Sequence, residues 1–360
     1  MRMMRLLFLA GALVAASGCS HALHLREGQP SAPADVVLQH EELVEHRLIL
    51  VGDAGKIAGS EVVMPYVLER ADDRSTVVFL GDNVYDYGEW EAILDEQLAV
   101  VGRAADVLFV PGNHDWDRGF DAIRRQQEYV EANGARYAPD AGCAGPTTLD
   151  VPGARLIVVD SQFFLLGDRE RPSLQCWDGA DAHFDALAEA LAAPTDDLRI
   201  MIAHHPLTTY GKHGGHFPWQ QHLQPPVIGS LIILARTTGL IGQDLSGGAY
   251  GDWADRMRAL LADSPPALFA AGHEHSLQVL AGGAMRASDH EADELPAYPE
   301  VVSGAGSKHG WVGHGDRTLY SEDTLGYAVL TILTDGRAAL EMYRVDEGEE
   351  RAWVGWITEE

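Results

Sequence analysis

The sequence predicts an α/β fold in which helices flank a parallel or mixed β-sheet. Five apolar segments have the length of buried strands, most are rich in β-branched residues, and each is followed by Gly, Pro or His. They are residues 48–51, 76–80, 107–110, 200–203 and 267–271. Apolar residues at helical spacing occur between them. This alternation indicates parallel strands joined through helices that cover the sheet.

The helices are predicted from apolar residues that recur every three or four positions. A helix between the first two strands would bury Val62, Val63, Tyr66 and Val67. The next interval has the same spacing at Trp90, Ile93, Leu94 and Leu98. Before the last of the five strands, we expect Asp252 to cap a helix whose core-facing residues are Trp253, Met257, Leu260 and Leu261.

Side chains of the kinds that bind metals follow all five strands. In chain order they are Asp53, Asp82, Asn113, His204, and the pair His273 and His275. Because α/β sheets place their chemistry at the carboxyl ends of their strands, we expect these residues to meet at one edge of one sheet. Carboxylate, amide and imidazole groups together suit iron, zinc or manganese better than magnesium or calcium.

Five motifs in this order resemble those of the calcineurin-like metallophosphoesterases. They are Gly-Asp-x-Gly at 52–55, Gly-Asp-x-x-Tyr at 81–85, Gly-Asn-His-Asp at 112–115, the His before x-Pro at 204–206, and Gly-His-x-His at 272–275. Most members begin with Asp-x-His, whose His binds the first metal, whereas this chain has Gly55 in that place. In the purple acid phosphatase branch a Tyr supplies the missing ligand, and this chain has Tyr85 there. The resemblance therefore implies a tyrosinate ligand; an aromatic side chain that only lines the site is the alternative.

The resemblance extends over roughly residues 46 to 310 and implies two mixed β-sheets packed face to face and flanked by helices. Residues 327–333 and 338–343 flank Thr334-Asp335-Gly336-Arg337, which is a hairpin signal. We expect this hairpin to complete the second sheet. The metallophosphoesterase domain is accordingly placed at residues 46–345, followed by an acidic tail at 346–360.

The resemblance also implies a dinuclear metal centre in which Asp82 bridges two ions. The first ion would be bound by Asp53, Asp82, Tyr85 and His275. It is expected to be Fe(III), because phenolate and carboxylate donors stabilise a trivalent ion. The second, a divalent Fe, Zn or Mn, would be bound by Asp82, Asn113, His204 and His273. A hydroxide bound to this centre would attack phosphorus in line with the leaving group.

Two histidines are expected to act on the leaving group. His114 directly follows the predicted ligand Asn113. His213 lies nine residues after His204. This spacing is similar to that of a histidine near the metal centre, not itself a ligand, in the small purple acid phosphatases. An ordinary surface position is the alternative for His213.

The segment that carries His213, residues 206–251, is irregular and rich in Gly, His and Pro. Because it follows a strand end, we expect it to overhang the site. His216 and His222 are the other candidates in this segment. We expect Asp115 to orient His114, and we assign His205 no ligand role.

The first residues have the pattern of an export signal. Arg2 and Arg5 precede an apolar segment too short to span a bilayer as a permanent helix, and Ala16-Ser17-Gly18-Cys19 ends it. This end resembles a bacterial lipobox. We therefore expect a lipoprotein-type signal peptide at residues 1–19, a tether at 20–45, and an exported protein that Cys19 anchors to a membrane, facing the periplasm or the cell exterior. An ordinary cleaved signal peptide is the alternative.

Two further cysteines, Cys143 and Cys176, form an even pair in a protein expected to be exported. We predict a disulfide between them, with two free buried thiols as the alternative. Such a bridge would contribute roughly 3 to 4 kcal/mol through loop closure.

The formal net charge is −28, from 54 acidic and 26 basic residues, and only three of the basic residues are Lys. No basic stripe is present, which argues against nucleic acid and favours a small phosphorylated substrate. Taken with this charge, the resemblance implies an acid phosphatase that hydrolyses phosphomonoesters. The alternatives are a phosphodiesterase or nucleotide hydrolase on the same metal site, and a non-catalytic lipoprotein that binds a phosphorylated ligand.

Overall fold

Two β-sheets form the centre of the computed structural model, which describes residues 24–25, 40–166, 176, 179–218, 236, 242–283, 285 and 295–358. Sheet 1 has the order β15 (Glu349–Trp356), β14 (Ala338–Val345), β13 (Leu325–Leu333), β2 (Val44–Val51), β3 (Ser75–Phe79), β4 (Asp106–Phe109) and β5 (Arg136–Tyr137). Sheet 2 has the order β1 (His24–Leu25), β12 (Thr318–Glu322), β10 (Leu277–Leu280), β11 (Glu300–Ser303), β9 (Leu268–Ala271), β8 (Leu198–Ile202), β7 (Ala154–Val158) and β6 (Thr147–Val151).

Both sheets are mixed. In sheet 1 the strands β2 to β5 are parallel, and β13, β14 and β15 are added to β2 in antiparallel order. In sheet 2 the strands β7, β8, β9 and β11 are parallel, and the outer strands are antiparallel. The predicted fold class, two mixed sheets flanked by helices, is confirmed.

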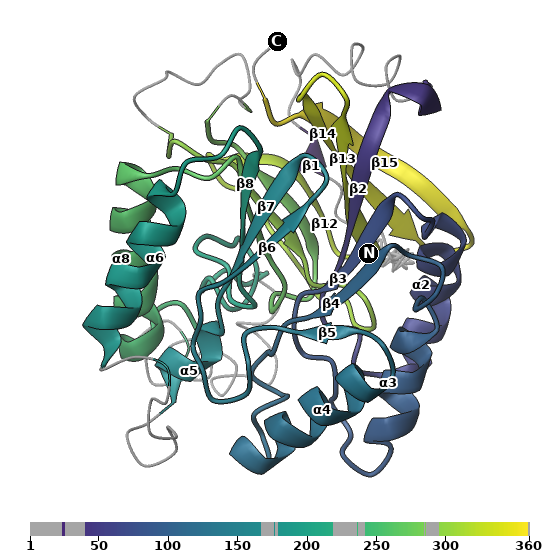
Figure 1. The fold of residues 1–360 in the computed structure, drawn as a ribbon, viewed down its shortest axis with the longest axis horizontal. Coiled ribbons are helices and arrows are strands. Elements are labelled where there is room, and N and C mark those ends of the chain that lie inside the picture. The colour runs from purple at the N-terminus through teal and green to yellow at the C-terminus, as the bar shows by residue number, and fades with distance from the viewer. Residues whose placement is uncertain are drawn as a thin grey trace, which may run out of the picture.

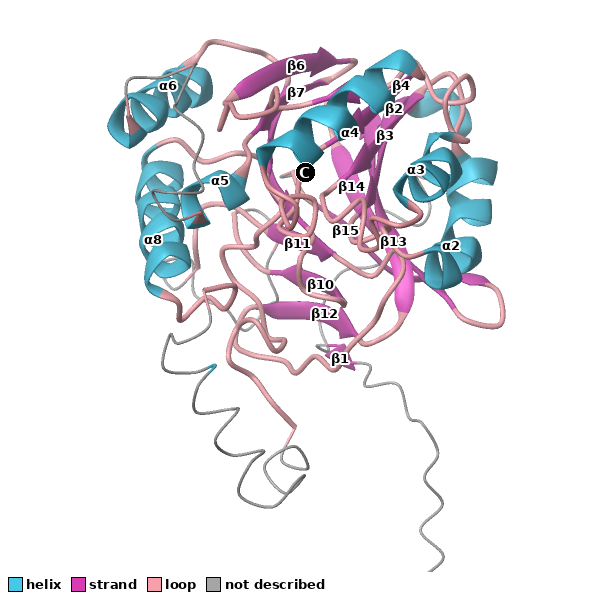
Figure 2. Ribbon diagram, turned by 90° about the horizontal axis from the view of Figure 1, so that it is seen from below, coloured by secondary structure: helices cyan, strands magenta, loops and turns pink. Residues whose placement is uncertain are grey.

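Helices cover the outer faces of the two sheets, as Figures 1 and 2 show. Sheet 1 is covered by α2 (Ile57–Arg70), α3 (Trp90–Leu98) and α4 (Phe120–Ala132). Sheet 2 is covered by α5 (Ser161–Leu165), α6 (Ala180–Ala192) and α8 (Gly248–Asp263). The 3₁₀ helix η1 (Glu41–Leu43) precedes β2.

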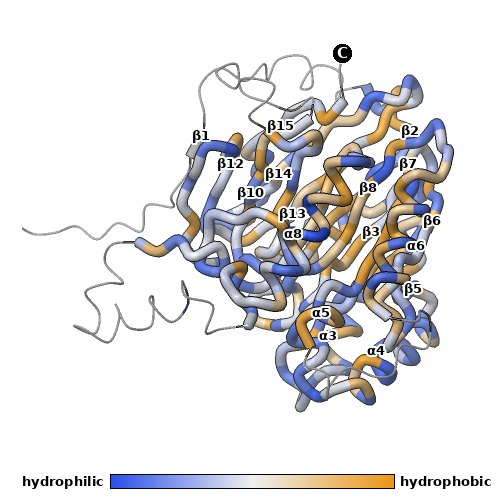
Figure 3. The backbone as a smooth tube through the Cα atoms, turned by 90° about the vertical axis from the view of Figure 1, so that its left-hand side faces the viewer, coloured by the Kyte–Doolittle hydropathy of each residue, from blue (hydrophilic) through white to orange (hydrophobic). Residues whose placement is uncertain are grey.

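Alternate residues of the central strands pack into different parts of the core, because neighbouring side chains of a strand point to opposite faces. One set fills the space between the sheets, and it includes Leu48, Leu50, Leu108, Leu156, Ile200 and Leu268. The intervening residues of sheet 1, such as Ile49, Val77 and Phe109, pack against α2 to α4. Those of sheet 2, such as Ile157, Met201 and Phe269, pack against α6 and α8. The strands therefore need apolar residues on both faces, which explains their continuous hydrophobic character in Figure 3.

The helix predictions are correct in position, with two local errors. Helix α2 buries Val63 and Val67, but Val62 is 37% exposed. Asp252 does not cap α8, because this helix begins one turn earlier, at Gly248, and Asp252 lies inside it.

Two predictions about the carboxyl-terminal part are wrong. The hairpin β13–β14 pairs with β2 and so belongs to sheet 1, the sheet of the first predicted strands. The acidic tail predicted at 346–360 contains β15, which pairs with β14 along its length. The acidic residues of β15 are matched by arginines, since Arg70 binds Glu349 at 2.6 Å and Arg344 binds Glu350. Trp353 and Val354 of the same strand are buried.

The amino-terminal predictions fall only partly on described residues. The signal peptide at 1–19 lies outside them. Within the segment predicted as a tether, the described residues include β1, which pairs with β12, and η1 and the start of β2, which lie before residue 46. In the described part of the chain, no helix combines the length and the apolar character that crossing a membrane requires.

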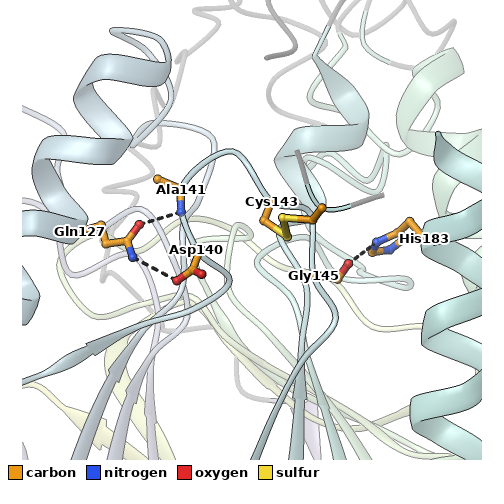
Figure 4. Close-up of a disulfide and its surroundings, with 7 residues drawn as sticks. Gln127, Asp140, Ala141, Cys143, Gly145 and His183 are labelled. Atoms are coloured by element: carbon orange, nitrogen blue, oxygen red, sulfur yellow. Dashed lines mark hydrogen bonds between the residues drawn. A yellow bond between two sulfur atoms is a disulfide. The ribbon is translucent and has the colours of Figure 1, made fainter. Parts of the chain in front are cut away.

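The connection between β5 and β6 carries the chain from sheet 1 to sheet 2, and helices hold it from both sides (Figure 4). Gln127 of α4 accepts a hydrogen bond from the Ala141 backbone N–H at 2.7 Å. His183 of α6 donates from Nδ1 to the Gly145 carbonyl at 2.6 Å, and burial lowers the pKa of His183 to about 4. The predicted disulfide joins Cys143 to Cys176, with 5.7 Å between their Cα atoms.

Replacing both cysteines, in Cys143→Ser/Cys176→Ser, is expected to lower the free energy of unfolding. The bridge closes a loop between residues 33 apart in sequence, and a loop of this length gives about 3 to 4 kcal/mol in the chain-entropy account. Denaturant unfolding of both proteins measures the difference. Reductant should destabilise the wild type by a similar amount and leave the double variant unchanged. Equal stability of the two oxidised proteins would contradict the expectation.

Candidate metal centre

The predicted ligands come from the carboxyl ends of strands in both sheets. Asp53, Asp82 and Asn113 follow β2, β3 and β4 of sheet 1, whereas His204 and His273 follow β8 and β9 of sheet 2. The expectation of one edge of one sheet is therefore wrong. The residues still meet, because the two sheets pack face to face and their carboxyl edges adjoin.

The segment after β11 connects the two edges at this point. The Ser303 carbonyl accepts a hydrogen bond from Gly52 N at 2.7 Å, and the Ser303 hydroxyl donates to the Leu50 carbonyl at 2.8 Å. Gly306 N donates to the Gly52 carbonyl at 2.9 Å. Sheet 2 is thus hydrogen bonded to the loop that carries Asp53.

Three of the predicted ligands have left-handed backbone conformations. Their φ angles are 58° at Asp53, 56° at Asp82 and 66° at His273. Asp and His adopt this region more readily than most residues, but it still costs roughly 1 to 3 kcal/mol. Non-glycine residues in this region concentrate at functional sites.

Glycines that precede two of the predicted ligands, Gly81 before Asp82 and Gly112 before Asn113, allow very close packing. A Cβ atom on Gly112 would lie 2.2 Å from Asp82 N and 2.9 Å from Cε1 of His204. A Cβ atom on Gly81, whose φ is 95°, would lie 2.4 Å from Nδ1 of His204. Only glycine lets the loops of the two sheets approach this closely.

One group of ligand atoms comprises Asp53, Tyr85 and His275. The Tyr85 hydroxyl donates to Oδ1 of Asp53 at 2.8 Å and lies 3.2 Å from Nε2 of His275. Nε2 of His275 lies 3.3 Å from the same carboxylate oxygen. Burial, together with the charges of Asp53 and Asp82, raises the pKa of Tyr85 well above its usual value. A bound cation would reverse this effect by stabilising the phenolate.

The second group comprises Asp82, Asn113, His204 and His273. Oδ1 of Asn113 lies 3.1 Å from Nε2 of His204 and 3.0 Å from Nδ1 of His273. Nε2 of His204 also lies 3.3 Å from Oδ1 of Asp82. Asp53, Asp82 and His204 offer ligand atoms that all lie within 4.8 Å of one another, so the two groups adjoin.

Whether a cation fits this second group depends on which nitrogens of His204 and His273 carry a hydrogen. His204 donates from Nδ1 to the Leu80 carbonyl at 2.8 Å, and His273 donates from Nε2 to the Gln243 carbonyl at 3.0 Å. Burial and the neighbouring histidines lower the pKa of His273 well below its usual value, which keeps its ring neutral. The nitrogens that face Asn113 therefore present lone pairs. A cation between the Asn113 oxygen, the two imidazole nitrogens and the Asp82 carboxylate would satisfy all of these acceptors, so the residues fit a metal ion.

His114 lies beside the two groups, and Asp117 rather than Asp115 orients it. Its backbone N–H donates to Oδ1 of Asp82 at 2.8 Å, and its Nδ1 lies 2.8 Å from Oδ2 of Asp117. The prediction for Asp115 is wrong because this carboxylate points beneath the loop. There it accepts the N–H groups of Gly112, Asn83 and Val84 at 2.7 to 3.2 Å.

His213 stacks against His273, with 4.2 Å between the ring centroids. Its Nδ1 lies 3.0 Å from Oδ1 of the buried Asp244, which Arg236 also binds through two nitrogens. Burial alone would lower the pKa of His213, but the hydrogen bond with Asp244 and the charge of Glu274 outweigh it and raise the pKa.

The other histidines of the site region lie elsewhere or have other partners. His216 packs on the ring of Tyr210, away from the ligand groups, and His222 lies outside the described residues. Nδ1 of His205 is 2.8 Å from the Ser161 hydroxyl, and Nε2 is 3.0 Å from Oε1 of Gln243.

Two hollows open beside the ligand groups. One, of about 480 Å³, is lined by Asn113, His114 and His213, with Trp116 and Gln162 among its other residues. The other, of about 900 Å³, is lined by Tyr85, His114, Lys56 and Lys308 and by several carboxylates. Nζ of Lys308 lies 3.0 Å from the centre of the Tyr85 ring.

Sequence reasoning missed the residues that support the predicted ones. They are Asp117, which contacts His114 three residues away in the same loop, and Asp244, Gln243 and Glu274, which act through contacts between loops that are distant in sequence. A local signal was present for Glu274, which lies between two predicted ligands, and for Asp117, which lies three residues after His114.

Metal-dependent hydrolases of α/β architecture hold their ligands on loops that follow parallel strands, and the predicted ligands of this chain have the same placement. A profile of the calcineurin-like phosphoesterase family matches residues 46–277, well over half of the chain. The chain belongs to this family, and the predicted resemblance is confirmed. A comparison with curated proteins gives no significant match.

Solved structures share the fold. GAP50, the anchor in the inner membrane complex of Plasmodium, aligns with a TM-score of 0.55 at 15% identity, over 87% of this chain and 88% of its own. A purple acid phosphatase from yellow lupin seeds (Lupinus luteus) aligns with a TM-score of 0.56 at 13% identity, over 86% of this chain. This chain spans only 53% of the lupin enzyme. PhoD aligns with a TM-score of 0.50 at 10% identity, over 86% of this chain and 72% of its own.

Asp82→Asn is expected to lower the bound metal from about two ions per chain to fewer than one, because the shared carboxylate charge is lost. The fold should persist, since Asn also tolerates the left-handed backbone of residue 82. Elemental analysis after dialysis measures the metal, and circular dichroism checks the fold. Asp117→Asn is the matched control, because Asp117 contacts His114 but neither ligand group, and it should keep its metal. Full metal content in Asp82→Asn would show that Asp82 is not a ligand.

Proposed function

We propose that the chain hydrolyses phosphoesters, and phosphomonoesters in particular, at a dinuclear metal centre. The observation that carries the proposal is the pair of adjoining ligand groups, one of which is composed of facing acceptor atoms. The family to which the chain belongs supports the same reaction class. The net charge of −28 favours a small phosphorylated substrate over nucleic acid.

The donors suggest different ions for the two positions. Asp53, Asp82, Tyr85 and His275 would hold the first ion, and the phenolate and carboxylates favour Fe(III). Asp82, Asn113, His204 and His273 would hold a divalent Fe, Zn or Mn. Two metal ions at such a site polarise the phosphoryl oxygens and lower the pKa of a bound water.

The residues of the chain itself position the substrate and the proton. His114 and His213 line the same hollow as Asn113, so both face a phosphoester bound beside the second ligand group. Asp244 engages Nδ1 of His213, which leaves Nε2 to hold the proton that the leaving oxygen needs. Asp117 fixes the ring of His114, which would stabilise the negative charge of the phosphoryl group.

The visible absorption spectrum, with elemental analysis of the same sample, tests the metal assignment. A broad charge-transfer band and about two metal ions per chain are expected, since phenolate bound to Fe(III) absorbs visible light. Tyr85→Phe should lose the band and keep the fold. A colourless protein with two Mn or Zn ions would refute the tyrosinate–iron assignment and leave phosphoester hydrolysis to be judged from activity.

Activity is measured on phosphomonoesters and phosphodiesters in parallel. Faster hydrolysis of monoesters is expected, with almost complete loss in Asp82→Asn. Faster hydrolysis of diesters would favour a phosphodiesterase. Because the same fold occurs in GAP50, an anchor, a metal-loaded protein that hydrolyses neither substrate would refute the proposal and support a binding role.

We also propose that the protein is exported and anchored through a lipid on Cys19. The lipobox-like end of the apolar segment supports this, and so does the disulfide, which persists in oxidising compartments. Mass spectrometry of the mature amino terminus, isolated from the native host, is expected to find acylated Cys19. An unmodified amino terminus at another residue would indicate an ordinary signal peptide instead.

A further inference from the structure

We propose that Glu274 is a positioning residue whose carboxylate holds the loop of His213 against the metal-ligand pair His273 and His275. This role rests on the proposed function, because His213 matters only where a leaving group must be protonated. Glu274 is only 4% exposed, and sequence reasoning assigned it no role.

The carboxylate of Glu274 points away from the ligand groups and into the loop after β8. Oε2 accepts the backbone N–H of His213 at 2.8 Å and the hydroxyl of Thr209 at 3.2 Å. Oε1 accepts the backbone N–H of Lys212 at 3.1 Å. Both oxygens are therefore engaged by residues 209–213, and charged acceptors make the stronger hydrogen bonds to backbone N–H groups.

The loop is shaped around this carboxylate. A Cβ atom on Gly211 would lie 2.1 Å from Cδ of Glu274, so the backbone wraps the side chain as closely as glycine allows. Gln278 of β10 supports the other end of the loop, because it accepts from Tyr210 N at 3.0 Å and donates to the Thr209 hydroxyl at 2.9 Å. The loop is thus fastened to the His273–His275 segment and to the strand that follows it.

Two carboxylates position different parts of His213. Glu274 fixes the backbone of His213, and Asp244 fixes the orientation of its ring. Glu274 lies between two predicted ligands, His273 and His275. The backbone segment that positions their metal-binding nitrogens therefore also positions His213, the proposed general acid. Glu274→Gln keeps the size of the side chain, but it removes the charge and replaces one acceptor oxygen with a donor NH₂ group.

The first test measures amide hydrogen exchange of residues 208–216 in metal-free wild-type and Glu274→Gln protein. Loss of the negative charge, and of the acceptor oxygen for one of the two backbone N–H groups, is expected to speed exchange of this segment about tenfold or more. Glu322→Gln is the matched control, since Glu322 is a buried carboxylate that binds Tyr320 and Arg344 instead. Unchanged exchange in Glu274→Gln would overturn the proposal whether or not the protein is an enzyme.

The second test compares phosphomonoesters with good and poor leaving groups. Glu274→Gln should keep its metal and hydrolyse p-nitrophenyl phosphate within about threefold of wild type, but lose about 10² in kcat on an alkyl phosphate, whose leaving oxygen needs a proton. His213→Asn should show the same pattern. The double variant should be no worse than His213→Asn, because both changes remove one function. Additive losses, equal losses on both substrates or loss of metal would contradict the positioning role.

The two tests separate the proposals. Faster exchange together with an inactive wild type would refute the proposed function and the catalytic part of this inference, and leave Glu274 only as a residue that holds the loop.

Discussion

Four acceptor atoms face one another at the centre of this structure, and the other features of the site keep them there. The carbonyls of Leu80 and Gln243 accept hydrogen bonds from His204 and His273, so that the other nitrogen of each imidazole presents a lone pair to the site. Without a cation these groups repel each other. The packing of the two sheets offsets this repulsion and also the cost of the left-handed backbone at Asp53, Asp82 and His273.

The supporting carboxylates are arranged in a second layer around the ligand groups. Asp117, Asp244 and Glu274 each bind a group that is not a predicted ligand, and each fixes a histidine ring or its backbone. Some of the acidic residues therefore position histidines of the site, in addition to contributing to the negative net charge of the chain. The chain's three lysines are Lys56, Lys212 and Lys308; two of them line one hollow beside the site, and Lys212 adjoins His213.

Much of this arrangement could be predicted from the sequence, because it depends on local patterns. The strands are covered on both faces and read as continuous apolar segments, and the ligand residues follow them directly. The division of the strands between two sheets could not be predicted, because nothing in the sequence of a buried strand specifies its partner. Asp115 was misassigned for a similar reason. Only the folded loop shows that three backbone N–H groups donate hydrogen bonds to its carboxylate. Asp244 lies 31 residues from His213, and no periodic pattern connects them.

The strand β15 sets the limit to which the chain can be shortened. A protein ending at residue 345 would leave the eight residues of β14 as an open edge, with the N–H and C=O groups that now bind β15 unpaired. That edge includes Leu340, Met342 and Tyr343, and an exposed apolar edge is a template for intermolecular strand pairing. The charged residues of β15, paired with arginines of other elements, now protect it. Strand β15 thus covers an edge that would otherwise be open to pairing with another molecule.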